Sequence, residues 1–461
     1  MKINSNIFLG VFIIIVLAIL LTNKIFFNDG SKKETGSDSG IIAVKNFENE
    51  KTDLNVNQSE NQSENQSVNQ SVNELMKENK IQKDSSENSK GKNYLQIHYD
   101  AILIDTHNDF IWKVFDKGAD LGVRNFNTQS DLPRFRAGGL DVQVFAVWIP
   151  MNQVKRSYSF TVSQIDKLKN FGTEYSSEFE FATNYDDIIK ITNDKKICGL
   201  IGIEGGTAIE KNLDNINAFY EMGVRYIGLT WNNSNNISTS ARDETERGKS
   251  GGLTEFGIQV IKRMNEVGML VDVSHLSEQG FWDVIENSTS PVIASHSNCY
   301  AVNPHFRNLT DEQIKAIAEN GGYIGINFYD KFLDKDADRN RTQNAYEKYS
   351  DELNALNEKY GDDLIKYNEE RNKFLEEHNI AGGTSIEKVL DHIDHIKNLA
   401  GVDCIGIGSD FDGGITPPNE LYDASCYPEL TKRLVERGYT ADEIKKILGG
   451  NFLRVFKQVC G

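Results

Sequence analysis

Histidine and carboxylate side chains close several short apolar segments of this sequence, and such side chains bind divalent metal ions. The first segment ends in Asp105-Thr106-His107-Asn108-Asp109. Because side chains alternate along a β-strand, His107 and Asp109 are expected on the same side. An imidazole and a carboxylate in this relation can bind one divalent ion. Taken alone the run is a weak indication, because aspartate also follows strands as a helix cap.

Glu204, His275 and His296 each close another apolar segment. Gly205 and Gly206 follow Glu204, and their missing side chains leave room for a ligand to approach the carboxylate. Each of the three candidates also has an ordinary structural explanation. A glutamate can cap a helix, and a buried histidine can be a hydrogen-bonded core residue. Their common position at segment ends favours a shared role.

Asp410 lies in a run, Gly408 to Gly414, that looks like the start of a calcium-binding loop. The bidentate glutamate that such a loop requires at its twelfth position is missing, because Leu421 stands there. We therefore predict that Asp410 lies beside the other candidate ligands. The remaining histidines are expected elsewhere: His392 and His395 on a solvated helix face, and His98, His305 and His378 in loops or flanking segments, with His305 near the site.

The segments that carry these residues are typical of parallel strands alternating with helices. Continuous apolar runs indicate strands buried on both faces. Capping-box patterns begin helices at Thr310, Thr384 and Thr440, and a helical apolar stripe ends at Gly401. The pattern predicts an α/β fold, a (β/α)8 TIM-like barrel, with a doubly wound open sheet as the alternative. The predicted strands are Ala101–Thr106, Val142–Ile149, Gly199–Glu204, Arg225–Thr230, Met269–Ser274, Val292–His296, Tyr323–Phe328 and Cys404–Asp410.

In a barrel the carboxyl ends of all strands meet at one face, where active sites lie. Five nitrogen and oxygen ligands would therefore converge there, with no thiolate among them. Histidine and carboxylate together suit zinc or, less specifically, manganese, cobalt or iron. Five ligands exceed the three that one catalytic zinc needs. Two metal ions that share a bridging carboxylate would use all five. Such a pair holds a hydroxide and polarises a carbonyl, which predicts hydrolysis.

The sequence divides into three parts before any fold is considered. Residues 1–27 are an apolar segment that predicts an uncleaved membrane anchor, with a cleaved signal peptide as the alternative. Residues 28–93 are a low-complexity linker with Asn-Gln-Ser repeats, which cannot form a core. Residues 94–461 are the predicted barrel. Within it, 329–383 is a charged helical insertion after the seventh predicted strand, expected to be a solvated hairpin, a lid or a dimer contact.

Composition excludes several other classes of protein. The formal net charge is −18, which is unfavourable for a nucleic-acid-binding protein. Five cysteines are too few for a disulfide-rich scaffold, and none lies in a Cys-x-x-Cys pair. The partners that we expect are therefore a small substrate and, through the N-terminal segment, a membrane. The cell membrane with an extracytoplasmic catalytic part is the expected location, and secretion after cleavage is the alternative.

The motifs together resemble the membrane dipeptidase (renal dipeptidase) family of zinc peptidases, in its bacterial type. The resemblance extends from about Tyr94 to Gly461 and rests on the order and spacing of six motifs. These are Asp105 to Asp109, Ile203-Glu204-Gly205-Gly206, Val273-Ser274-His275, Ser295-His296-Ser297, Asn303 with Arg307-Asn308, and Gly406 to Gly413. The family implies a peptidase that cleaves dipeptides, including those with a C-terminal D-amino acid. It also implies a homodimer.

The resemblance implies a role for each candidate residue. His107 and Asp109 would bind one zinc ion, His275 and His296 the other, and Glu204 would bridge the two, with a hydroxide held between them. By the same resemblance Asp410 would transfer the proton to the leaving amine. Arg307 would bind the substrate carboxylate, a task that suits a guanidinium.

One position departs from the mammalian members of the family. They carry a histidine that contacts substrate after the fourth strand, whereas Trp231 stands at that position here. We expect Trp231 and Asn232 to contact the substrate instead. Two other functions stay open, a different binuclear barrel amidohydrolase (a lactonase or an amino-acid deacylase) and a non-catalytic surface binding protein. The amidohydrolases commonly use a carboxylated lysine as the bridge, where this chain has Glu204.

Overall fold

The computed structural model describes residues 94–125, 128–337, 348–360, 363–378 and 384–461. The predicted anchor at 1–27 and the linker at 28–93 lie outside the described residues and stay predictions. Among the residues that are described, no helix is long and apolar enough to cross a membrane.

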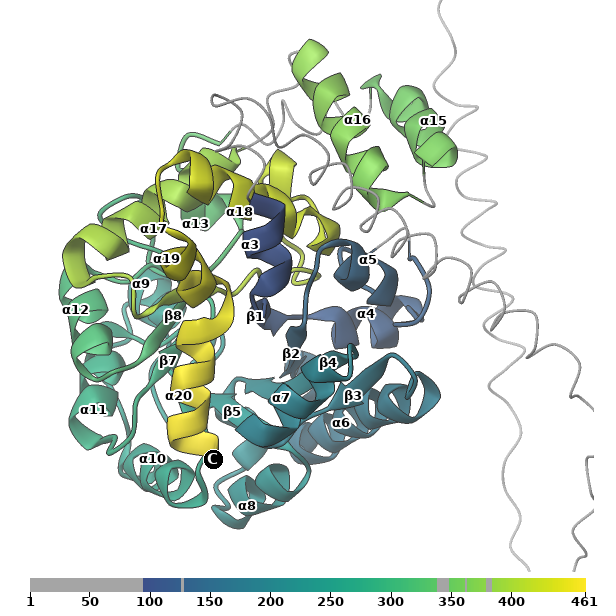
Figure 1. Cartoon of the computed structure of the whole chain (residues 1–461). Helices are drawn as coiled ribbons and strands as arrows, with labels where there is room; N and C mark the ends of the chain where they lie inside the picture. The colour runs from purple at the N-terminus through teal and green to yellow at the C-terminus, as the bar shows by residue number, and fades with distance from the viewer. Residues whose placement is uncertain (1–93, 126–127, 338–347, 361–362, 379–383) are drawn as a thin grey trace, which may run out of the picture. The chain divides into compact units, whose positions relative to one another are not determined.

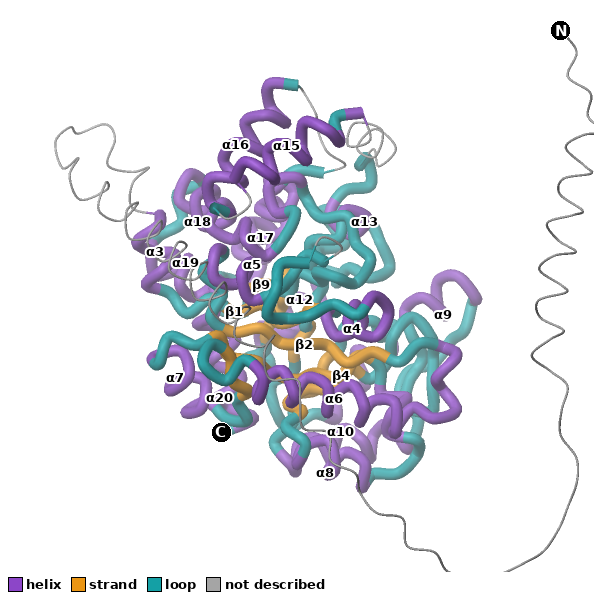
Figure 2. The backbone as a smooth tube through the Cα atoms, turned by 90° about the vertical axis from the view of Figure 1, so that its right-hand side faces the viewer, coloured by secondary structure: helices purple, strands orange, loops and turns teal. Residues whose placement is uncertain are grey.

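Eight parallel strands close into a barrel, which confirms the predicted (β/α)8 architecture and excludes the open sheet. Each strand pairs with the next around the ring, and the β2–β4 pair closes it. Figure 2 shows the strands at the centre, with helices around them. The strands are β1 (Ile104–Asn108), β2 (Val142–Trp148), β4 (Ile197–Glu204), β5 (Val224–Gly228), β6 (Leu270–Asp272), β7 (Ile293–Ala294), β8 (Tyr323–Ile326) and β9 (Ile405–Ile407).

Six strands (β2, β5, β6, β7, β8 and β9) end one to three residues earlier than predicted, and one short strand was missed. β6 and β9 stop before His275 and Asp410, whose φ angles are 70° and 66°. A positive φ lies outside the β region, so neither residue can belong to a strand. β7 is also shorter and ends before His296. The extra strand β3 (Phe179–Phe181) pairs only with the start of β4.

Helices follow the strands around the barrel (Figure 1). The capping boxes predicted at Thr310 and Thr440 are confirmed. The one at Thr384 is wrong, because Ser385 is the N-cap and its hydroxyl accepts the Glu387 N–H. The helices outside the insertion are α3 (Tyr94–Asp100), α4 (Phe110–Lys117), α5 (Leu132–Ala137), α6 (Ser157–Glu174), α7 (Tyr185–Asn193), α8 (Asp214–Glu221), α9 (Ala241–Arg247), α10 (Glu255–Val267), α11 (Glu278–Asn287), α12 (Asp311–Glu319), α17 (Ile386–Ala400), α18 (Tyr427–Glu436), α19 (Ala441–Lys445) and α20 (Asn451–Cys460).

Helix α20 closes the end of the barrel at which the strands begin. Phe452, Val455 and Phe456 pack with apolar side chains from the strands, and the ring of Phe452 lies 5.3 Å from that of Tyr323. In Figure 1 the helix lies across this end. Because apolar side chains fill this end, a polar site can form only at the other end, where the strands finish.

Two of the histidine assignments are wrong. His392 is fully buried: its Nδ1 accepts the Cys299 N–H at 3.0 Å, and its Nε2 lies 3.2 Å from the Leu333 carbonyl oxygen. His98 is also fully buried, in α3. Both join segments that are distant in the sequence, which a local pattern does not reveal.

Helices follow β8 in the region where the insertion was predicted. They are α13 (Asp330–Leu333), α15 (Ser350–Tyr360) and α16 (Leu364–Glu377), and α15 and α16 lie side by side (Figure 2). α16 is anchored on the segment after β9: Tyr422 OH donates to Asn368 Oδ1 at 2.6 Å, and Arg371 donates to the Asn419 carbonyl at 2.9 Å. α16 is therefore not a freely solvated hairpin.

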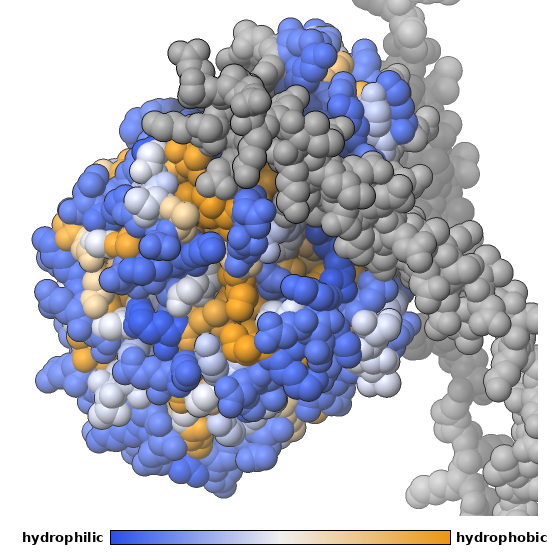
Figure 3. Space-filling model, in the orientation of Figure 1, coloured by the Kyte–Doolittle hydropathy of each residue, from blue (hydrophilic) through white to orange (hydrophobic). Residues whose placement is uncertain are grey.

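The surface shown in Figure 3 is mostly hydrophilic, with hydrophobic residues visible near the centre of the view. All five cysteines are buried, and none forms a disulfide. Stability of the described part therefore comes from its packed core rather than from covalent cross-links.

Candidate metal centre and substrate pocket

Four strand ends bring all five predicted metal ligands together. His107 and Asp109 come from the end of β1, Glu204 is the last residue of β4, and His275 and His296 follow β6 and β7. All five are buried. The Oε1 atom of Glu204 is the common neighbour: it lies 2.9, 3.5 and 3.7 Å from the Nε2 atoms of His275, His296 and His107, in that order.

The ligand atoms form two overlapping groups. His107, Glu204 and His296 make one, and His107, Asp109 and Asp410 make the other, with the ligand atoms of each group within 4.8 Å of one another. His107 belongs to both groups. The second group places Asp410 beside the cluster, where the sequence analysis expected it.

Hydrogen bonds hold His107 and His275 in the tautomer that a metal ligand needs. The Nδ1 atom of His107 lies 3.0 Å from Tyr226 OH, which itself donates to the Thr106 carbonyl and therefore accepts from the ring. The Nδ1 atom of His275 lies 3.2 Å from Asn232 Oδ1, which can only accept. Both Nδ1 atoms thus carry the proton, and both Nε2 lone pairs face the other candidate ligands. The Nε2 atom of His275 lies 3.0 Å from that of His296.

His296 is oriented by a longer chain of hydrogen bonds. Its Nδ1 lies 2.8 Å from Ser295 Oγ, and this hydroxyl donates to Asp272 Oδ2 at 2.6 Å. Asp272 is buried in β6 and also accepts the N–H groups of Ser274 and Ser295. The sequence analysis missed Ser295 and Asp272 as functional residues. The available signal was an aspartate within an apolar strand, three positions before His275.

A second buried aspartate, Asp105, fixes the end of β1 by accepting several hydrogen bonds. Asp105 accepts hydrogen bonds from the Ser409 N–H at 2.8 Å, the Ser409 hydroxyl at 2.6 Å and Tyr427 OH at 2.8 Å. It also accepts the His107 N–H at 3.2 Å. These bonds tie the strand that carries His107 to the start of the loop that carries Asp410.

Burial sets the charge of the cluster. It lowers the pKa of His107 to about 3 and the pKa values of His275 and His296 well below 6.5, with the charge of Arg307 acting in the same direction. The imidazoles are therefore neutral. Burial, followed by the charge of neighbouring carboxylates, raises the pKa values of Glu204 and Asp109.

The donor set fits a divalent metal ion. His107 Nε2 is buried without a hydrogen-bond partner among the described residues, although its ring lies beside two carboxylates. An unpartnered acceptor of this kind is costly unless a ligand occupies it. Neutral imidazole nitrogens with carboxylate oxygens suit zinc among the common metal ions.

Asp410 is held in an unusual backbone conformation at the edge of the cluster. Its φ of 66° is rare for a residue with a side chain, and the same holds for His275. Such strain is typical of functional positions. Asn327 Nδ2, which follows β8, donates to Asp410 Oδ2 at 2.9 Å. Burial raises the pKa of Asp410 to about 6. Sequence reasoning did not identify Asn327.

Arg307 lies in a pocket of about 590 Å³ beside the cluster. The side chain is buried, and its Nη2 donates to the His296 carbonyl at 3.2 Å. Its Nε–H has no partner among the described residues. His275 lines the same pocket, so the free guanidinium donor lies near the metal ligands. His305 also lines it and stacks on Phe306.

The two other residues that were predicted to contact the substrate, Trp231 and Asn232, make different contacts near the cluster. The Trp231 ring packs on Trp148, with ring centroids 4.9 Å apart. Asn232 uses its side-chain oxygen to orient His275. Contact of either residue with the substrate stays a prediction.

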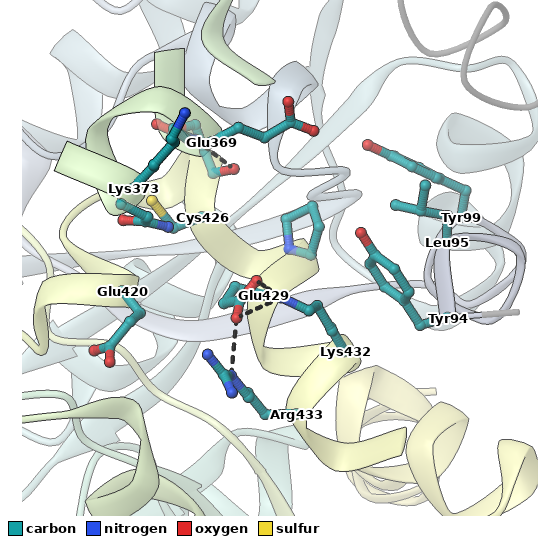
Figure 4. A pocket seen from close by; sticks show the side chains of 14 residues that line it. Tyr94, Leu95, Tyr99, Glu369, Lys373, Glu420, Cys426, Glu429, Lys432 and Arg433 are labelled. Atoms are coloured by element: carbon teal, nitrogen blue, oxygen red, sulfur yellow. Dashed lines mark hydrogen bonds and ion pairs between the residues drawn. The ribbon is translucent and has the colours of Figure 1, made fainter. Parts of the chain in front are cut away.

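A second hollow, of about 340 Å³, lies between α3, α16 and α18 (Figure 4). It shares no residue with the metal cluster. The charged groups at its centre neutralise one another, because Glu429 pairs with both Lys432 and Arg433. We therefore take the cluster of histidines and carboxylates, and not this hollow, as the candidate active site.

Comparison with known proteins agrees with this geometry. A model of the membrane dipeptidase family, Peptidase family M19, matches residues 92–460. An uncharacterized dipeptidase of Schizosaccharomyces pombe is 30% identical over 377 residues, which cover 78% of this chain and 80% of that protein.

Solved structures show the same fold. The crystal structure of a dipeptidase AC, a metallo peptidase of family M19, matches with a TM-score of 0.64 and 25% identity over 78% of this chain and 99% of that one. A metallo peptidase of Rhodobacter sphaeroides, liganded with a phosphinate mimic of the dipeptide L-Ala-D-Ala, matches with a TM-score of 0.64 and 25% identity over 78% and 100%.

Proposed function

The chain belongs to the membrane dipeptidase family, Peptidase family M19, and from this premise we propose that it is a zinc-dependent dipeptidase that binds two zinc ions per chain. The observation that carries the proposal is the position of Glu204 Oε1 within 3.7 Å of three imidazole Nε2 atoms. A carboxylate at the centre of several neutral imidazoles suits a bridge between two cations.

Five residues would hold the ions. His107 and Asp109 would bind one, His275 and His296 the other, and Glu204 both. When bound, two zinc ions act as Lewis acids on a substrate carbonyl and lower the pKa of a water molecule towards neutrality. The hydrogen bonds that Tyr226, Asn232 and Ser295 accept from the Nδ1 atoms keep the imidazoles in the ligating tautomer.

Asp410 moves the proton in this proposal. Asn327 holds the carboxylate by donating to its Oδ2, and the carboxylate accepts a proton from the attacking water and delivers it to the leaving amine. A pKa of about 6 suits a group that must both accept and release a proton near neutral pH.

Arg307 binds the C-terminal carboxylate of the substrate. Its charge is buried and one of its N–H donors is unpartnered, so a carboxylate would gain a charge-assisted hydrogen bond there. Such a contact restricts cleavage to short peptides. The dipeptide mimic bound by the Rhodobacter sphaeroides enzyme ends in D-alanine, which supports substrates with a C-terminal D-amino acid.

The proposal also covers location and assembly. Residues 1–27 anchor the chain in the cell membrane, and residues 28–93 tether an extracytoplasmic catalytic part, with secretion after signal cleavage as the alternative. The resemblance to the family supports a homodimer.

Metal content and hydrolysis, measured together, test the proposed reaction. Purified chain is stripped with a chelator, reloaded with zinc, and assayed on L-L and L-D dipeptides, the matching tripeptides and dipeptide amides. We expect about two zinc ions per chain, cleavage of dipeptides only, and loss of cleavage in Glu204→Gln. A folded protein that holds two zinc ions but cleaves no dipeptide would instead favour a lactonase or deacylase, and one that binds no metal would favour the surface binding protein.

A further inference from the structure

Three of the four tryptophans of the chain form one aromatic cluster beside the metal ligands. The rings of Trp112 and Trp148 have centroids 5.1 Å apart and meet edge to face, and those of Trp148 and Trp231 are 4.9 Å apart in a similar arrangement. Each ring is only partly buried. The cluster therefore presents apolar surface that is still accessible.

Trp148 and Trp112 are each a neighbour of a proposed metal ligand. Trp148 is the last residue of β2 and pairs in register with Glu204 at the end of β4. Neighbours in register on parallel strands point to the same face, so both side chains lie at the barrel mouth. Trp112 lies one helical turn after Asp109, and its N–H donates to the Asp109 carbonyl at 2.9 Å.

Trp231 packs against the residue that follows Glu204. A Cβ atom at Gly205 would lie 3.3 Å from Trp231 Cβ and 3.4 Å from its backbone nitrogen. Gly205 also has a φ of 93°, which disfavours any residue with a side chain. The glycine thus lets the tryptophan approach the strand end that carries the central carboxylate.

The order of strands separates this cluster from Arg307. The ring runs β2-β1-β9-β8-β7 on one side and β2-β4-β5-β6-β7 on the other, so β2 and β7 lie opposite each other. Trp148 ends β2, whereas Arg307 follows β7. None of the three tryptophans lines the pocket that holds Arg307. A dipeptide whose carboxylate binds Arg307 therefore has its N-terminal residue towards the tryptophans.

We propose that Trp112, Trp148 and Trp231 bind the side chain of the N-terminal residue, so that the enzyme prefers dipeptides beginning with a large apolar residue. This inference rests on the proposed dipeptidase function. Removing a leucine or phenylalanine side chain from water against an apolar surface favours such a substrate by about tenfold to a hundredfold over glycine.

Hydrolysis rates of matched dipeptides test the preference. With zinc-loaded full-length chain, kcat/KM is measured for Phe-Gly, Leu-Gly and Gly-Gly, and for the reversed pairs Gly-Phe and Gly-Leu. We expect kcat/KM for Phe-Gly and Leu-Gly to exceed that for Gly-Gly by about tenfold or more, and the reversed pairs to gain less.

Variants of Trp148 test the cluster itself. In Trp148→Ala the ratio of kcat/KM for Phe-Gly to that for Gly-Gly falls to within about threefold, whereas Trp148→Phe keeps most of it. Trp282→Phe, a tryptophan of α11 outside the cluster, is the matched control. Equal rates on Phe-Gly and Gly-Gly, or an unchanged ratio in Trp148→Ala, would overturn the proposal and leave the dipeptidase function standing.

Tryptophan fluorescence gives a readout that needs no hydrolysis. Zinc-depleted full-length chain is titrated with Phe-Gly and with Gly-Gly. We expect a saturable change in emission with Phe-Gly at lower concentration than with Gly-Gly, unchanged in Trp282→Phe and reduced in Trp148→Phe. If no dipeptide is cleaved but this change is seen, the binding surface is supported while the dipeptidase function fails. Identical titrations with the two dipeptides would count against the surface.

Discussion

At the scale of single residues, the proposed metal centre depends on the hydrogen bond that each histidine makes through Nδ1, the nitrogen that faces away from the cluster. Tyr226, Asn232 and Ser295 each accept a hydrogen bond from one Nδ1 atom. Three different side chains thus have the same effect: each leaves the Nε2 lone pair of a neutral imidazole exposed.

Ser295→Ala is expected to weaken zinc binding by about tenfold to a hundredfold, because His296 loses the acceptor that fixes its tautomer. Zinc affinity is measured by competition with a coloured chelator, so the result does not depend on activity. Ser297→Ala is the matched control, since its buried hydroxyl has no hydrogen-bond partner among the described residues. Equal zinc affinity in the two variants would refute the role of Ser295.

His98 predicts a pH dependence of stability away from the active site. Burial lowers its pKa to about 4, below the unfolded value near 6.5. Between these values the unfolded chain binds more protons, so the stability contributed by neutral His98 is lost as the pH falls from 6.5 towards 4. The loss amounts to roughly 2 kcal/mol by pH 5.

The variant His98→Gln isolates this term. At pH 7.5 the variant is less stable than the natural chain, because His98 lies 2.7 Å from Thr431 Oγ and 2.9 Å from the Gly138 carbonyl. The difference in unfolding free energy, measured by urea denaturation, should shrink between pH 7.5 and pH 5. A difference that stays constant would show that His98 has the same pKa in the folded and the unfolded chain.

At the scale of elements, short strands and the loops that follow them build the site. β6 has three residues and β7 has two, and the proposed ligands His275 and His296 come after them. A buried aspartate, Asp272, accepts N–H groups from Ser274 and Ser295 and so ties these two strand ends together. At the opposite end of the barrel α20 packs apolar side chains against the strands, and its Asn451 donates to the Val402 and Ile405 carbonyls.

Phe452→Ala in α20 is expected to lower the free energy of unfolding by about 3–5 kcal/mol, because it leaves a cavity under the barrel. Chemical denaturation measures the loss. KM for dipeptides should stay unchanged, since the metal ligands lie at the other end. Gln458→Ala, an exposed position on the same helix, controls for the loss of a side chain from α20. A loss below about 1 kcal/mol would show that α20 does not cover the core.

At the scale of the whole molecule, the first residues that the structure describes pack against the barrel. Ile97 and His98 of α3 are buried, so the folded unit includes α3 and does not start at β1. Residues 1–93 precede it and contribute none of the proposed ligands.

Deleting residues 1–27 is expected to move the protein from the membrane fraction to the soluble fraction without changing kcat/KM for dipeptides. Fractionation with an alkaline carbonate wash measures the first effect. The mass of the protein purified from cells decides between an anchor and a cleaved signal. Full-length, uncleaved chain in the soluble fraction would contradict the anchor.

Starting the chain at Leu103 instead of Tyr94 should lower stability, because this removes α3 with its buried Ile97 and His98. A thermal unfolding midpoint equal to that of the chain from Tyr94 would show that α3 is dispensable.

The sequence alone determined the barrel and the proximity of the five ligands. Eight apolar runs alternating with helical patterns predict a closed parallel sheet, and a closed sheet brings the ends of its strands to one face whatever their separation in the chain. For that reason His107 and His296 were predicted to lie close together although they are far apart in the chain. Their neighbours Thr106 and Ser295 form a hydrogen bond across a separation of 189 residues. Asp410 followed from the same geometry.

The tertiary structure alone decided how these groups are held. His392 was misplaced because its burial depends on Cys299 and Leu333, and Thr384 because the choice of cap between adjacent hydroxyl residues depends on backbone conformation. Asp105, Asp272 and Asn327 were missed, and so was the cluster around Trp148. Such contacts join loops that follow different strands, and no local period in a sequence encodes them. They exist only once the barrel has closed.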